Sequence, residues 1–96
     1  MKYLIIDGMF SGTGIRDSVE GGYLNPAELG LSSELKRKIS DWVSRYEDEH
    51  YLQYEDKSMV ADLDAEGIKI CNLLKSEIPN LKVEYYSTAE MKKIIV

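Results

Sequence analysis

The stretch LIIDGMFSGTGIRD, residues 4–17, decides the fold. Leucine and β-branched residues at 4–6 predict a short buried strand that ends at Asp7. Gly8, Gly12 and Gly14 follow in a spacing that dinucleotide-binding loops use after a strand. Such a loop must open a long helix whose N-terminus binds the pyrophosphate, but residues 15–26 hold two more glycines and a proline. We therefore expect a surface excursion over residues 8–24 and no bound cofactor.

Length and composition indicate one domain, residues 1–96. The chain is 44% hydrophobic and 30% charged, which is typical of a globular protein. No apolar run approaches the roughly 20 residues of a membrane span, and the single cysteine allows no internal disulfide. We expect a cytoplasmic protein without a membrane partner.

Two long helices follow the excursion. Ser32 is a suitable N-cap, and Ser58 can cap the second helix. Apolar residues recur at helical spacing at Leu35, Ile39, Trp42, Val43 and Tyr46, and again at Val60, Leu63, Gly67, Ile70, Cys71, Leu74 and Ile78. Gly67 lies inside the second stripe and predicts close packing on the first helix.

The C-terminal part predicts one strand and an ambiguous tail. Residues 82–86 alternate as a strand does. Residues 87–90 match a capping box and favour a short helix at 88–94, whereas residues 92–96 read equally well as a last strand. The expected fold is a small α/β (α+β) domain, with two to four strands and two long antiparallel helices packed on them. So small a sheet needs added pairing from the glycine-rich segment or from a partner.

The charge is uneven along the chain. The net charge is −5, and residues 41–66 alone hold nine acids and two bases, a net of −7. A free-standing nucleic-acid binder needs a basic face, so we expect no direct binding of nucleic acid. Tyrosines interleave with acids over residues 46–56, a composition that suits a protein interface as well as an ordinary solvated surface.

Other motifs fail in their details. Residues 62–67 resemble the start of a calcium loop, but position 12 of that loop is Leu73 and not Glu, so we expect no metal. His50 is the only histidine, and Cys71 lies on an apolar helix stripe, so no catalytic residues are predicted. The alternative hypotheses are a small nucleotide-binding or hydrolytic enzyme using Asp7 and the Gly8–Gly14 loop, and a self-associating structural subunit.

Most of the chain resembles a known kind of small bacterial protein. The residues that carry the resemblance are GIRDSVEGGYLNPAELGLSSELKRKISDWVSRYEDEHY (14–51), LDAEGIKICNLLKSEIP (63–79) and VEYYS (83–87). They are similar to immunity proteins of contact-dependent growth inhibition systems. The resemblance implies a cytoplasmic, non-enzymatic antidote that binds a cognate toxin domain, often a basic nuclease, and occludes its active site.

Together, the resemblance and the acidic tyrosine-rich segment predict the binding residues. Carboxylates would pair with basic groups of the toxin, and tyrosines would fill the centre of the interface. The expected contact residues are Asp17, Glu47, Asp48, Glu49, Tyr51, Tyr54, Glu55 and Asp56. The sequence leaves open whether the acidic helix–loop or the glycine-rich loop makes the contact, and which oligomeric state the chain adopts.

Overall fold

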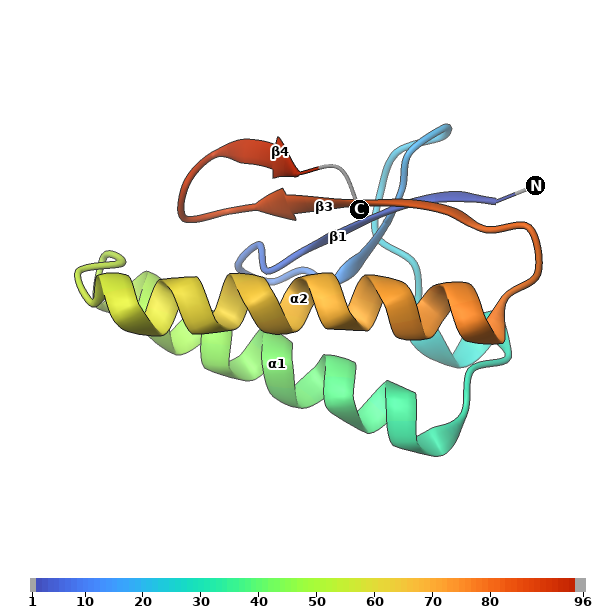
Figure 1. The fold of residues 1–96 in the computed structure, drawn as a ribbon, viewed down its shortest axis with the longest axis horizontal. Helices are drawn as coiled ribbons and strands as arrows, with labels where there is room; N and C mark the ends of the chain where they lie inside the picture. Colours follow the sequence, from blue (N-terminus) through green and yellow to red (C-terminus); the bar gives the residue numbers. More distant parts are fainter. Residues whose placement is uncertain (1, 95–96) are drawn as a thin grey trace.

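A mixed four-stranded sheet forms one layer of the molecule, and two helices pack on one of its faces (Figure 1). The computed structural model describes residues 2–94. Its elements are β1 (Tyr3–Asp7), β2 (Ile15–Asp17), a 3-10 turn (Pro26–Leu29), α1 (Ser33–Tyr51), α2 (Lys57–Glu77), β3 (Lys82–Ser87) and β4 (Lys92–Ile94). The predicted fold class, a small α+β domain with two long helices, is confirmed.

The strand order is β2-β1-β3-β4. The central pair, β1 and β3, is parallel, and Leu4 lies opposite Val83. Parallel neighbours require a crossover connection, which here contains β2 and both helices. The two edge strands pair antiparallel with their neighbours. The end of β1 and the second half of α1 lie on the same side of the molecule, because Gly8 packs against the Tyr46 ring.

The glycine-rich segment supplies the extra pairing that a small sheet needs. Its residues 15–17 form β2, and the chain then turns back beside this strand. The Asp17 amide donates to Gly22 at 3.0 Å, and the Leu24 amide donates to Ile15 at 2.8 Å. The expectation that this segment extends the sheet is therefore confirmed.

The two helix starts differ in how well they were predicted. Ser32 caps α1 through a 3.1 Å bond from the Leu35 amide, as expected. The prediction for α2 is wrong, because Asp56 and not Ser58 is its N-cap and accepts from the Met59 amide at 3.0 Å. Aspartate caps a helix as well as serine does, and its charge also favours the positive end of the helix dipole.

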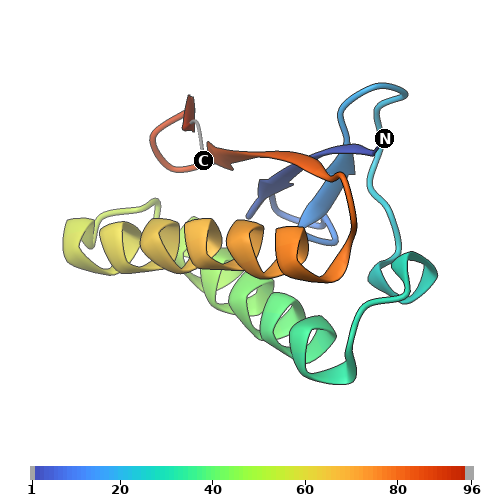
Figure 2. The same cartoon turned by 45° about the vertical axis from the view of Figure 1, so that its right-hand side comes forward.

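The core lies between the helices and one face of the sheet (Figure 2). Leu4, Ile6 and Tyr85 point from the strands into this layer and are almost fully buried. The indole of Trp42 donates to the Leu63 carbonyl at 2.8 Å and ties α1 to α2. Within residues 2–94, no helix lies over the opposite face of the sheet (Figure 2).

Gly67 permits close packing, as predicted, but its nearest neighbour is in the sheet. A Cβ at this position would clash with the ring of Tyr85 and would lie 2.9 Å from the Trp42 ring of α1. The small residue therefore makes room for two aromatic rings at once.

The sequence allowed either a short helix at 88–94 or a strand at 92–96, and the structure has a strand, β4. The Ser87 hydroxyl accepts from the Glu90 amide at 3.2 Å, as a helix cap does, but the chain continues only as a turn. Lys92–Ile94 then pairs with β3 as β4. Residues 95–96 of the predicted strand lie outside the described residues.

Candidate partner-binding surface

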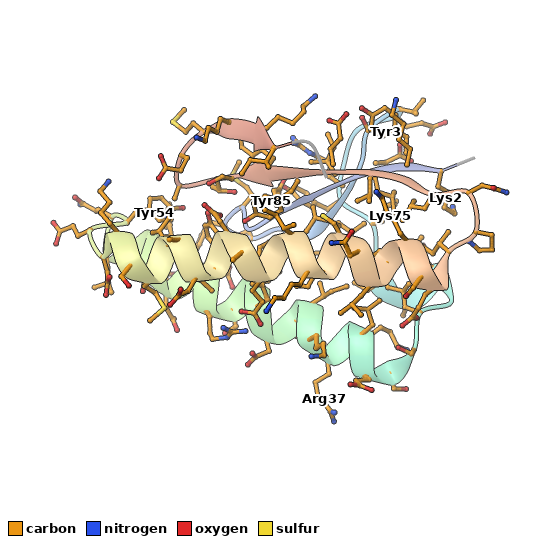
Figure 3. All side chains as sticks on the ribbon, viewed as in Figure 1. Lys2, Tyr3, Arg37, Tyr54, Lys75 and Tyr85 are labelled. Carbon is orange, nitrogen blue, oxygen red and sulfur yellow. The ribbon has the colours of Figure 1, made fainter. Side chains whose placement is uncertain are left out.

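The acidic region of the sequence becomes one end of the molecule. Residues 41–66 form the second half of α1, the connecting loop and the first half of α2, which fold back on each other as a helical hairpin. Figure 3 shows Tyr54 at this end and Lys2 and Lys75 toward the opposite end. The net charge of −7 that residues 41–66 carry is therefore concentrated at one end of the molecule.

An aromatic cluster covers the tip of this hairpin end. Phe10, from the loop after β1, stacks on His50 with ring centroids 4.9 Å apart. The Tyr51 ring meets Phe10 edge-on at 5.5 Å, and Tyr54 meets His50 edge-on at 5.9 Å. Such pairs hold large apolar surfaces in a fixed arrangement at low entropic cost.

Much of this cluster faces solvent. The exposed fractions are 39% for Phe10, 69% for Tyr51 and 57% for the adjacent Leu52. A contiguous exposed apolar surface with a polar rim is typical of protein interaction sites on soluble proteins. We call this surface the hairpin patch. It consists of the exposed rings of Phe10 and Tyr51, of Leu52, and of the carboxylates of Glu47, Asp48 and Glu55.

The glycine-rich loop and the acidic helix form this patch jointly. The Ser11 amide donates to the Glu47 carboxylate at 3.1 Å, which fixes the loop against α1. Gly8 lies against the Tyr46 ring, where any Cβ would clash. The sequence leaves open whether the helix or the loop makes the contact. In the structure, Phe10 and Ser11 of the loop and Glu47 and Tyr51 of α1 form a single surface.

The predicted carboxylates differ in their surroundings. The carboxylates of Asp48 and Glu55 are exposed, and neither has a hydrogen-bond partner within residues 2–94. Asp56 caps α2 and Glu47 accepts from Ser11, so these two also have structural roles. Within residues 2–94, none of the predicted acids from 47 to 56 pairs with a lysine or arginine.

Glu49 is an exception among the predicted acids. It is only 7% exposed, and its Oε1 atom has no hydrogen-bond partner within residues 2–94. A buried carboxylate of this kind cannot contact a partner without a rearrangement of its neighbours, so Glu49 is not part of the exposed patch.

Tyr51 and Tyr54 also differ from each other in exposure. Tyr51 is largely exposed, whereas Tyr54 is half-buried and packs edge-on against the core ring of Tyr46 at 6.0 Å. Burial raises the pKa of Tyr54. Tyr54 therefore mainly completes the core, and Tyr51 is the tyrosine that the patch presents.

Asp17 does not join the patch. It lies opposite Leu4 in the β1–β2 register, near the start of β1, whereas the patch adjoins the end of β1. Its Oδ1 accepts from the Val19 and Glu20 amides at 2.8 and 3.0 Å, and these bonds lower the pKa of its carboxyl. The structure gives Asp17 a turn-forming role at a different place from the other predicted residues.

The glycine spacing of residues 8–14 has a packing explanation. Gly14 is followed by β2 and not by a helix, and its φ of +93° beside Val43 suits only glycine. Asp7 is fully buried, accepts from the Tyr23 hydroxyl at 2.8 Å and lies 3.4 Å from the Arg16 guanidinium. The carboxylate and the loop thus serve internal contacts.

Sequence reasoning missed a polar network at Asp64. Its carboxylate accepts from the hydroxyls of Tyr46 at 2.8 Å, Tyr85 at 2.5 Å and Ser87 at 2.7 Å. In the sequence, Asp64 is one of the nine acids of residues 41–66 and lies in the segment that resembles the start of a calcium loop. No cluster of acids, histidines or cysteines within residues 2–94 is arranged for a metal. The position of Asp64 beside Leu63 on the buried stripe of α2 was the available signal.

Phe10 was missed as well. The available signal was an apolar pair, Met9-Phe10, inside a segment of glycines and hydroxyl residues, and both side chains remain about 40% exposed. A large apolar residue in such a loop requires either a core to bury it or a surface function.

Comparisons with known proteins give no further guidance. Neither of the two helices within residues 2–94 is both long and apolar enough to cross a membrane. A scan against models of protein families finds no match for the chain, and a search of curated proteins finds no related sequence.

Proposed function

We propose that this chain is a non-enzymatic immunity protein of the cytoplasm that binds a basic toxin domain through the hairpin patch. The observation that carries the proposal is the exposed pair of rings, Phe10 and Tyr51, surrounded by carboxylates that have no basic partner within residues 2–94. Exposed aromatic anchors with a charged rim are the composition of a protein interface.

Charge supports a basic partner in particular. Asp48 and Glu55 project from the end of the molecule that holds the excess acid. Their field would accelerate encounter with a cationic surface, and the aromatic rings would then slow dissociation. A toxin that cleaves nucleic acid carries such a cationic surface because it must bind phosphates. An immunity protein seated there blocks the substrate without any chemistry of its own.

The test is rescue from toxicity. A toxin domain encoded by a neighbouring reading frame is expressed with and without the chain, and growth is measured. Association kinetics of the purified pair are then followed by stopped flow at low and high salt. We expect rescue, and an association rate that falls about tenfold or more as salt is raised.

Isosteric variants locate the contact. E47Q/D48N/E55Q removes three charges from the patch and keeps the acceptor that Ser11 uses, and E20Q/E28Q/E34Q removes three exposed charges elsewhere. The patch variant should lose most of the salt dependence of association, and the control should keep it. Equal behaviour of the two variants, or a toxin that kills in the presence of the chain, contradicts the proposal.

A further inference from the structure

A groove of about 360 Å³, lined by polar and apolar atoms, runs along α1 beside the hairpin patch. One wall is the face of α1 that carries Lys36, Ser40, Ser44 and Glu47, whose spacings of four, four and three place them on one side of a helix. The other wall is formed by Gly12, Thr13 and Pro26 of the excursion between β1 and α1.

Three polar side chains of the groove, Lys36, Ser40 and Ser44, have no partner for their polar groups within residues 2–94. Lys36 is half-buried, yet its ammonium has no acidic partner within residues 2–94. The hydroxyls of Ser40 and Ser44 likewise have no hydrogen bond with another described residue. In contrast, Thr13 on the facing wall donates to the Leu24 carbonyl at 2.6 Å. A cation and two hydroxyls without internal partners therefore lie in sequence along one line, and the Glu47 carboxylate, one oxygen of which accepts from Ser11, follows them.

We propose that this groove binds an extended polypeptide segment with a basic side chain at the Glu47 end and a carboxylate at the Lys36 end. Lys36 and Glu47 are eleven residues apart on the helix, which corresponds to about 16 Å of axis. An extended chain covers that distance with about five residues. The two serine hydroxyls lie between the charged ends, where they can bind main-chain groups of the segment.

Charge and length exclude other occupants. A free amino acid is too short to reach both charged ends of the groove. A nucleic-acid strand would bring phosphates against Glu47 and the acidic end of the molecule. A polypeptide carries both signs of charge at the required separation, together with a backbone that suits hydroxyl partners.

This inference deepens the proposed function, because Glu47 belongs both to the groove and to the hairpin patch. In a toxin complex, the segment would belong to the same basic partner. The patch would then govern how fast the two proteins meet, and the filled groove would govern how slowly they separate.

Defined peptides test the groove without any toxin. The isotope-labelled protein is titrated with acetyl-Arg-Thr-Ser-Thr-Glu-amide, with the reversed order acetyl-Glu-Thr-Ser-Thr-Arg-amide, and with a control that has Gln at both ends. We expect one charged order to shift the NMR signals of Gly12, Thr13, Ser40 and Ser44 with millimolar affinity, and the Gln control to bind about tenfold more weakly. No shift at these residues with either charged peptide, or equal binding of the Gln control, overturns the proposal.

Two variants make the result specific. Ser44 is exposed on the groove wall, so Ser44→Trp fills the groove and should abolish the shifts. The matched control is Arg37→Trp, since Arg37 points away from the body of the molecule in Figure 3. Lys36→Gln removes the charge and leaves the groove open, and we expect it to weaken peptide binding about tenfold. This variant tests the groove even if Ser44→Trp perturbs folding. Full peptide binding by both groove variants overturns the proposal.

The peptide titration and the rescue experiment together test the groove and the immunity function separately. Peptide binding without rescue from any toxin supports the groove and contradicts the immunity function. Rescue that Ser44→Trp leaves intact, combined with no peptide binding, contradicts the groove and supports the function.

Discussion

Asp64 shows how one residue can link three elements. From α2 it accepts hydroxyl bonds from Tyr46 of α1 and from Tyr85 and Ser87 of β3. Tyr46 in turn accepts from the Ala89 amide at 3.1 Å, which fixes the turn after β3. The helical periodicity of apolar residues identified Tyr46 and Leu63 as core residues. It could not identify the network, because hydroxyl–carboxylate pairing depends on which residues meet across the core.

The first prediction is that Asp64→Asn is much more destabilising than a neutral surface change. An amide offers one acceptor oxygen in place of two, so at least one of the buried hydroxyls that now donate to Asp64 loses its partner. We expect the free energy of unfolding to fall by about 3 kcal/mol, and by about 1 kcal/mol for Tyr85→Phe. Urea unfolding measures both. Asp62→Asn, at an exposed position of the same helix, is the control, and an equal effect of the two Asn variants would refute the role of the network.

The second prediction concerns Gly67. A methyl group there would clash with the Tyr85 ring and press on Trp42, although alanine favours a helix by about 1 kcal/mol over glycine. We expect Gly67→Ala to lower the free energy of unfolding by more than about 2 kcal/mol, because the packing clash outweighs the helix propensity. Asn72→Ala, at an exposed site of α2, should be neutral or stabilising. A stabilised Gly67→Ala variant would show that the rings move aside freely.

At the scale of elements, the sequence predicts what local chemistry controls. The strand that ends at Asp7, both helices and the strand after residue 81 follow from the periodicity of apolar residues, and the cap of α1 follows from Ser32. The parallel pairing of β1 with β3 does not, because it joins residues about 79 apart, such as Leu4 and Val83. The short edge strands β2 and β4 form only against these central strands, so three-residue segments carried too little local signal.

The third prediction tests the start of α2. Asp56→Ala removes the carboxylate that accepts from the Met59 amide, so we expect a loss of about 1 kcal/mol in the free energy of unfolding. Ser58→Ala changes a residue inside the first turn and should be close to neutral. Urea unfolding of the two variants side by side decides the matter. The reverse order of effects would mean that the helix begins at Ser58 in solution.

At the scale of the whole molecule, the chain separates two tasks. The sheet, Asp64 and the inward faces of both helices hold the fold together. The hairpin patch exposes the rings of Phe10 and Tyr51, and the groove holds Lys36, Ser40 and Ser44, whose polar side-chain groups have no partner within residues 2–94. Of the predicted binding residues, exposure supports Glu47, Asp48, Tyr51, Glu55 and Asp56 as members of one surface. Composition located this surface along the chain. It could not show that Glu49 turns inward or that Phe10 joins from a distant loop, since both depend on how α1 packs.

The last prediction is a loss of stability at alkaline pH. Burial raises the pKa of Tyr46 to about 12, and burial with the bond to Asp64 raises the pKa of Tyr85. An unfolded tyrosine titrates near pH 10, so above that pH the unfolded chain releases protons that the folded chain retains. The stabilisation from these two residues is thus complete below about pH 10 and falls as the pH rises toward the folded values, by up to about 1.4 kcal/mol per pH unit for each tyrosine. Urea unfolding between pH 8 and pH 12 measures the slope. Tyr85→Phe should start from a lower stability and show a shallower decline, and an unchanged slope in that variant would contradict the assignment.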